Sequence, residues 1–176
     1  RYAERLGRSA NSFDELYQTL QQKPTYIDEL LLDILKEKLE SINPTLFLIS
    51  VPFPGNLYSA FRSAQWVKKN YPKVKIVMGG GFPNTELRSL SDARVFEFFD
   101  FITLDDGELP VELLCDLVFN SPPLEGCPKD GVVSSGELKR TFILENGKVV
   151  YKNNSTRPDY KQSQVGTPDY SDLFLD

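Results

Sequence analysis

Residues 45–56 read TLFLISVPFPGN, an apolar run that ends in a turn rich in proline and glycine. A continuous run of large apolar residues is typical of a parallel β-strand that is buried on both faces. The run therefore predicts a strand over residues 45–51, and its prolines and glycine predict a turn at 50–56.

The order of strand, turn and helix recurs twice after this stretch. Strands are predicted over 74–79 and 99–104, followed by a glycine-rich turn at 79–84 and an acidic turn at 105–108. Apolar residues at helical spacing predict helices at 57–71, at 84–90 and from Pro110 onward, the last with an inward face of Val111, Leu114, Cys115 and Val118. This alternation predicts an α/β fold, a doubly wound parallel sheet of the Rossmann-like type, because parallel strands need crossover helices.

The chain is divided into three predicted parts. Residues 1–42 are interpreted as an N-terminal helical segment, with an apolar stripe that we expect to pack on the sheet: Ile27, Leu31, Ile34, Leu35, Leu39 and Ile42. The α/β domain is assigned to residues 43–120. Residues 121–176 are interpreted as a linker, a small β-hairpin around Asn146-Gly147, and a connector.

The composition limits the classes of function. The 176 residues include no histidine, which excludes a histidine general base and a histidine metal ligand. The two cysteines, Cys115 and Cys127, are too few to ligate an iron–sulfur cluster alone, and Cys115 is expected in the core. The formal net charge of −5, without a basic stripe, argues against a nucleic-acid partner.

The same composition indicates a compartment. No apolar run approaches the ~20 residues of a membrane span, and the cysteine content is too low for a secreted disulfide scaffold. We therefore expect a cytoplasmic protein with no membrane partner. The chain begins at Arg1 rather than at methionine, so we expect a piece of a larger protein.

All three predicted turns fall on one rim, because in such sheets ligands bind beyond the carboxyl ends of the strands. The run Gly79-Gly80-Gly81 suits either backbone amides that approach a ligand closely or a tight strand-to-helix turn. Ser50 suits either a hydroxyl that faces the crevice or a turn cap. The sequence leaves each pair of readings open.

The aromatic and acidic residues of these turns also have two readings each. Phe53 and Phe82 suit a cover for a large ring system or packing beneath the loops. The carboxylates of Asp105, Asp106 and Glu108 suit acid/base chemistry or a hard cation, but we favour a role in capping the following helix, whose dipole attracts negative charge.

Taken in order, three stretches resemble the cobalamin-binding domains that are fused to radical S-adenosylmethionine (radical SAM) enzymes. They are Asn43–Asn56, Lys75–Arg88 with its glycine turn, and Asp100–Pro110 with its Asp-Gly-Glu turn. The resemblance implies a crevice for a small-molecule cofactor, lined by Ser50, Pro52, Phe53, Gly79, Gly80, Gly81, Phe82, Asp106, Gly107 and Glu108. Thr167–Tyr170 resembles the connector that precedes the radical SAM barrel.

The resemblance implies cobalamin as a cofactor, but this chain departs from the family. The cobalt-ligating motif Asp-x-His-x-x-Gly is absent, and the first strands of such a domain are not found before residue 45, which leaves a truncated sheet open. The cluster motif Cys-x-x-x-Cys-x-x-Cys is also absent, so S-adenosylmethionine and the 4Fe–4S cluster are expected only in another part of the parent protein.

Two functions follow as hypotheses, and in both the chain itself is not catalytic. The first is an accessory domain that supplies a cofactor or substrate crevice to a radical SAM enzyme. The second is an interaction module of the same fold that has lost cobalamin and docks on the radical SAM barrel of the same polypeptide.

Overall fold

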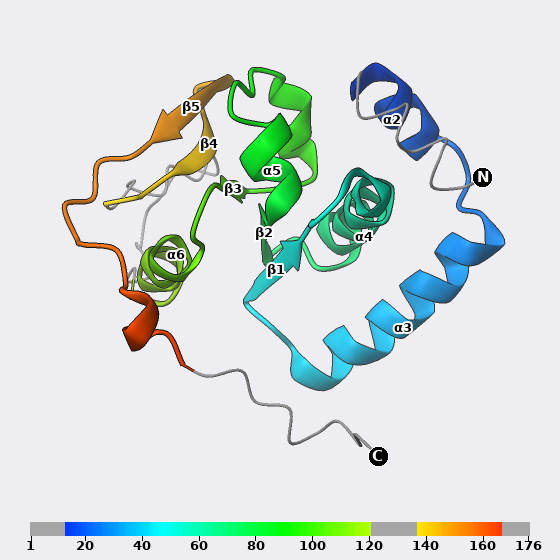
Figure 1. The fold of residues 1–176 in the computed structure, drawn as a ribbon. Helices are drawn as coiled ribbons and strands as arrows, with labels where there is room; N and C mark the ends of the chain where they lie inside the picture. Colours follow the sequence, from blue (N-terminus) through cyan, green and yellow to red (C-terminus); the bar gives the residue numbers. More distant parts are fainter. Residues whose placement is uncertain (1–12, 121–136, 167–176) are drawn as a thin grey trace, which may run out of the picture.

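The computed structural model describes residues 13–120 and 137–166, which build one five-stranded sheet with helices on both faces (Figure 1). Cys127, the predicted linker and the connector at 167–170 lie outside the described residues. The strands are β1 (Leu46–Ser50), β2 (Lys75–Gly79), β3 (Phe101–Thr103), β4 (Thr141–Glu145) and β5 (Lys148–Lys152).

The sheet is mixed. Strands β1, β2 and β3 run parallel in that order, which confirms the predicted parallel arrangement. The predicted hairpin is present as β4 and β5, and β4 pairs antiparallel with β3. The hairpin therefore extends the sheet beyond its parallel part.

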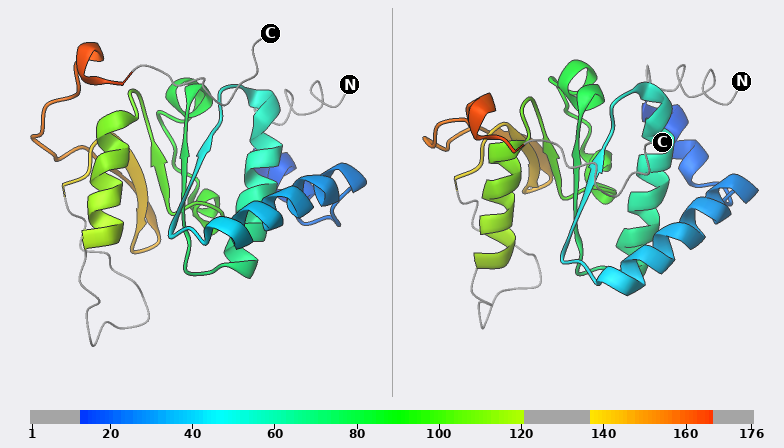
Figure 2. Two further views of the ribbon diagram at one scale, coloured as in Figure 1. Left: turned by 90° about the horizontal axis from the view of Figure 1, so that it is seen from below. Right: turned by 60° about the horizontal axis from the view of Figure 1, so that its bottom comes forward.

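Two helices cover opposite faces of the parallel strands (Figure 2). Helix α4 (Leu57–Asn70) lies on one face, with α2 (Phe13–Leu20) and α3 (Tyr26–Ile42) outside it. Helix α6 (Glu108–Asn120) lies on the other face. The alternation of side chains along β2 serves both cores, because Ile76 and Met78 belong to the α4 cluster and Val77 belongs to the α6 cluster.

Strand β1 differs from its prediction. It pairs only with β2 among the described strands, and its side chains are unequally covered: Phe47 and Ile49 pack against the α4 cluster, whereas Leu48 is 46% exposed. The apolar run predicted a strand that is buried on both faces, and this is wrong because an edge strand is incompletely covered.

The segment after β2 begins its helix earlier than predicted. Helix α5 spans Gly81–Glu86, not 84–90, because Gly80 takes a φ of 103° and turns the chain directly into the helix. The described chain also has short 3-10 turns, at Pro54–Asn56 before α4, and at Ala93–Glu97 and Gln162–Gln164 after α5.

Helix α3 buries only part of the predicted stripe: Leu39 is buried, and Leu31 and Leu35 are half-buried. Its buried residues are Asp28, Leu32 and Leu39, whereas Ile27 and Ile34 are each 61% exposed, and Ile42 is also exposed. The physical reason is a buried polar contact: the Asp28 carboxylate is drawn inward by Tyr58, which fixes the rotation of α3 about its axis.

Helix α6 is also rotated relative to its prediction. Its buried face is formed by Leu109, Leu113, Leu114 and Leu117. Of the predicted inward face, Leu114 is fully buried, while Val111, Cys115 and Val118 are only half-buried. Cys115 is a free thiol at the border of this core and not within it.

Candidate functional site

The three turns after the parallel strands are joined by hydrogen bonds at one rim of the sheet. The Val51 amide donates to the Gly79 carbonyl (2.7 Å), and the Phe82 amide donates to the Val51 carbonyl (2.9 Å). The Asp105 amide donates to Asn84 Oδ1 (2.6 Å). The predicted meeting of the three turns is therefore present.

The glycine turn packs tightly against the end of β1. A β-carbon on Gly80 would lie 2.8 Å from the Val51 nitrogen and 2.9 Å from Ser50 Oγ. A β-carbon on Gly81 would lie 2.7 Å from the Pro52 carbonyl oxygen. Gly80 also has a φ of 103°, in the left-handed region that favours glycine. The close approach is made by the chain's own backbone.

The glycine turn also lies close to the neighbouring strand β3. A β-carbon on Gly79 would lie 2.9 Å from Thr103 Oγ1 on β3. The Thr103 hydroxyl itself donates to the Met78 carbonyl (3.4 Å). Together these contacts explain all three glycines without a ligand.

Of the two aromatic residues predicted at the rim, one is exposed and the other is buried. Phe53 is 70% exposed, whereas Phe82 is 3% exposed and belongs to the α4 core cluster. The burial of Phe82 favours the second of its two interpretations, packing beneath the loops, because the early start of α5 directs this side chain into the core. Ser50 and Pro52 are exposed beside the glycine turn.

The acidic turn is held from two sides. Asp105 has a φ of 59° and forms an ion pair with Arg88. The Asp106 carbonyl accepts a hydrogen bond from Arg140 Nη2 (2.9 Å), and Asp106 itself is exposed to solvent. Glu108 is exposed in the first turn of α6, where a negative charge is favourable for the helix dipole.

Sequence reasoning missed Arg140, which ties the acidic turn to the segment after β5. Its Nη1 donates to Asp159 Oδ2 (3.0 Å), and its Nε is buried without a hydrogen-bond partner among the described residues. The hydrogen bond that Arg140 donates to Asp159 raises the pKa of Arg140 and lowers the pKa of Asp159. No local sequence pattern indicates this role of Arg140, because its partners Asp106 and Asp159 are far from it in the sequence.

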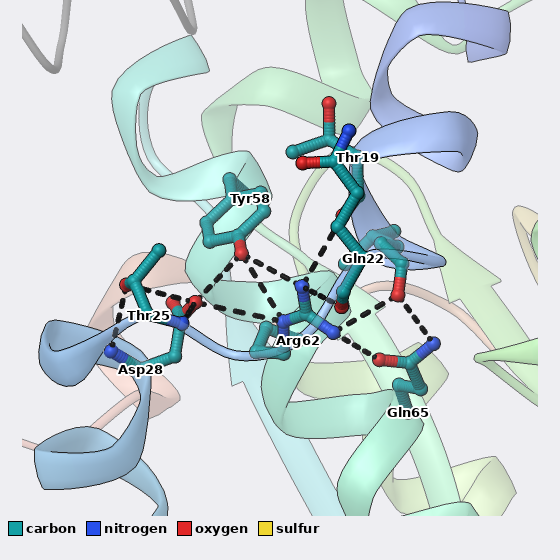
Figure 3. Close-up of polar contacts among 8 residues, drawn as sticks. Thr19, Gln22, Thr25, Asp28, Tyr58, Arg62 and Gln65 are labelled. Carbon is teal, nitrogen blue, oxygen red and sulfur yellow. Dashed lines mark hydrogen bonds and ion pairs between the residues drawn. The ribbon is translucent and has the colours of Figure 1, made fainter.

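A second missed cluster lies between α2, α3 and α4 (Figure 3). The buried Arg62 donates from Nε to the Tyr58 hydroxyl (3.1 Å) and from Nη1 to the Leu20 carbonyl (2.9 Å). The Tyr58 hydroxyl donates to Asp28 Oδ2 (2.8 Å), and burial raises the pKa of Tyr58. The cluster fixes the three helices together.

The spacing of this cluster was visible in the sequence. Tyr58, Arg62 and Gln65 lie at helical spacing on α4, on the side that faces α2 and α3. A charged residue within an otherwise apolar helix face is the signal that would have found it.

The packing of the glycine turn is explained by the chain itself. β-carbons on Gly79 and Gly80 would meet Thr103 and the end of β1, whereas Ser50 remains exposed at the rim. The chain also has no histidine to ligate cobalt. Among the described residues, no group of three or more histidine, cysteine, aspartate or glutamate side chains is placed to hold a metal ion.

Comparison of the chain with protein-family models, with curated proteins and with solved structures finds no match. None of the helices within residues 13–120 and 137–166 is long and apolar enough to cross a membrane.

Proposed function

We propose that this chain is an interaction module that binds no cobalamin itself and docks on a radical SAM barrel of the same polypeptide. The observation that supports this most strongly is the packing of the glycine turn, where β-carbons on Gly80 and Gly81 would meet the backbone of Val51 and Pro52. A turn that is closed by its own chain needs no ligand to explain its glycines.

The fold type is part of the proposal. Three parallel strands, with α4 and α6 on opposite faces and the connecting turns on one rim, favour a doubly wound, Rossmann-like domain similar to the cobalamin-binding domains of radical SAM enzymes. The antiparallel β4 and β5 are an addition at one edge.

The outer part of the rim has the chemistry of a docking surface. Phe53 offers an exposed aromatic ring, and aromatic residues are enriched where proteins contact one another. Asp106 and Glu108, two residues apart on the acidic turn at 105–108, offer exposed carboxylates. Exposed charges beside an aromatic anchor suit orientation of a second domain.

The docking surface is tested by hydrogen exchange on the 176-residue chain and on a longer polypeptide that includes the radical SAM barrel. We expect slower amide exchange at residues 50–56 and 105–108 in the longer polypeptide, and Phe53→Ser should reverse this protection. Phe119→Ser, which changes an exposed aromatic residue on α6, is the matched control. Equal exchange in both polypeptides would contradict the docking surface.

Cobalamin binding by the rim is a second candidate, favoured by one observation. A β-carbon on Gly107 would meet nothing within 4 Å, so the acidic turn leaves room that the glycine turn does not. The ring would then lie against the outer rim and need a second domain to cover it. Calorimetric titration with hydroxocobalamin distinguishes the two: the proposal expects no binding by either polypeptide, and this candidate expects binding by the longer one.

A further inference from the structure

Helix α3 has a second apolar face, which no described element covers. Four side chains share it, namely Tyr26 (71% exposed), Ile27 (61%), Leu30 (44%) and Ile34 (61%). At 3.6 residues per turn they fall within an arc of about 100°, opposite the buried Leu32 and Leu39. Figures 1 and 2 show α3 at the periphery of the described chain, with α4 on its inner side.

A row of carboxylates borders this face. Glu29, Asp33 and Glu37 follow the spacing of one helix side and are all exposed. Within residues 13–120 and 137–166, none of the three forms an ion pair, whereas Glu40 in the same row pairs with Lys36 (3.9 Å). The face thus combines about two turns of apolar surface with three carboxylates that form no ion pair in the described chain, beside the exposed Lys36 and Lys38 of the same helix.

The face is held rigidly. Thr25 and Asp28 form a capping box at the start of α3, and Asp28 is bound to Tyr58 in the buried cluster that contains Arg62 (Figure 3). The rotation of the helix is therefore fixed with Leu32 inward and Ile34 outward. A surface that is ordered before binding loses less conformational entropy when a partner docks.

We propose that this face of α3 binds an amphipathic helix of a partner protein, whose apolar stripe is flanked by lysine or arginine. The stripe would cover Ile27, Leu30 and Ile34, in the mode of helix-on-helix recognition. The basic residues would lie against the carboxylate row, where opposite charges speed association and fix the register.

A second copy of this chain is a poorer occupant. Pairing of α3 with the α3 of another copy would bring the rows that contain Asp33 and Glu37 towards each other, and like charges on neighbouring helix positions are destabilising. The inference goes beyond the proposed function, because the α3 face and the rim are separate surfaces, and loss of docking at one leaves the other unchanged.

The test uses a fluorescent synthetic helix of 18 residues, with leucine along one stripe and lysine elsewhere, titrated with the 176-residue chain. We expect saturable binding that Ile34→Lys weakens at least tenfold, that the double variant Asp33→Lys/Glu37→Lys also weakens, and that Ile34→Leu retains. Phe119→Lys is the matched control, because it makes the same charge change at an exposed apolar residue of another helix. Circular dichroism of each variant checks that it is folded.

Three results would overturn the proposal. The first is binding that Ile34→Lys leaves unchanged, or that Phe119→Lys weakens equally. The second is equal binding of a matched helix with glutamate in place of lysine. The third is self-association of the free chain that Ile34→Lys abolishes, which would assign the face to a second copy. None of these results bears on hydrogen exchange at the rim.

Discussion

The three turns at this rim of the sheet all contain glycine, and two of them, at 79–81 and at 105–108, differ in whether they need it. The turn at 79–81 is closed: Gly80 has a φ of 103°, and a β-carbon there would lie 2.8 Å from the Val51 nitrogen. The turn at 105–108 is open: Gly107 has a negative φ and free space around it. Both turns follow parallel strands, so their position in the fold does not distinguish them.

The difference teaches that a glycine at a strand end is not by itself a mark of ligand binding. In the closed turn the chain itself occupies the space that a β-carbon would need, so the glycine is a packing requirement. In the open turn the glycine is not required by any described contact, so its surroundings have room for a second domain or a ligand. Substitution of alanine for each glycine adds one methyl group, and the resulting change in the free energy of unfolding distinguishes the two turns.

The largest effect is expected for Gly80→Ala. The substitution combines a left-handed backbone with a β-carbon 2.8 Å from the Val51 nitrogen, so we expect the free energy of unfolding to fall by about 3 kcal/mol or more. Urea unfolding followed by circular dichroism measures it. A loss below about 1 kcal/mol would mean that the turn is looser than described.

A smaller effect is expected for Gly81→Ala, which has no left-handed strain. Its β-carbon would lie 2.7 Å from the Pro52 carbonyl oxygen, and backbone atoms yield less readily than a side chain. We expect a loss of about 2 kcal/mol in the free energy of unfolding, within the range for overpacked sites. Faster amide exchange at residues 50–52 should accompany it, and unchanged exchange there would place the strain elsewhere.

The stability of the fold around the open turn should depend on pH, because Arg140 pairs with the titratable carboxyl of Asp159. Because Arg140 lowers the pKa of Asp159, the ionised pair stabilises the fold above the unfolded pKa of the carboxyl, and this contribution is lost as the pH falls through the lowered value. Asp159→Asn should therefore cost at most about 1 kcal/mol at pH 7 and nothing in acid. Unfolding of both proteins at several pH values measures this, and a cost that persists in acid would argue against the ion pair.

The smallest effect is expected for Gly107→Ala. The new methyl group would meet nothing within 4 Å, so the free energy of unfolding should stay the same or rise by up to about 1 kcal/mol, because alanine restricts the unfolded chain. This variant is the matched control for Gly80→Ala. A loss comparable to that of Gly80→Ala would remove the distinction between the turns.

Much of the fold was predictable from local pattern. The runs of apolar residues identified the three parallel strands and the Asn146-Gly147 hairpin, and the alternation with helices placed the turns on one rim. Edge position was not predictable, because the apolar run of β1 is the same whether or not a strand lies beyond it. The rotation of α3 was missed because Asp28 is buried through Tyr58, which is 30 residues away.

The position of the candidate site in the fold was predictable from the sequence, but the roles of its residues were not. The glycines, Ser50, Phe53 and the acidic turn all lie at the rim, yet whether glycine serves a ligand or a packed backbone depends on distances across two loops. Phe82 turned inward because α5 starts at Gly81, a boundary that the sequence pattern placed three residues later. Arg140 and Arg62 act over long sequence separations that no local motif records.

The central proposal is that this chain binds no cobalamin and that its glycine turn is a packing element. A ligand that binds only the native state raises the free energy of unfolding, by about 2.7 kcal/mol at a concentration one hundred times its Kd. Urea unfolding of the 176-residue chain with increasing hydroxocobalamin measures this directly. We predict an unchanged free energy of unfolding over the whole concentration range. A saturable increase, lost in a variant with Ser50→Trp at the edge of the turn, would contradict the account.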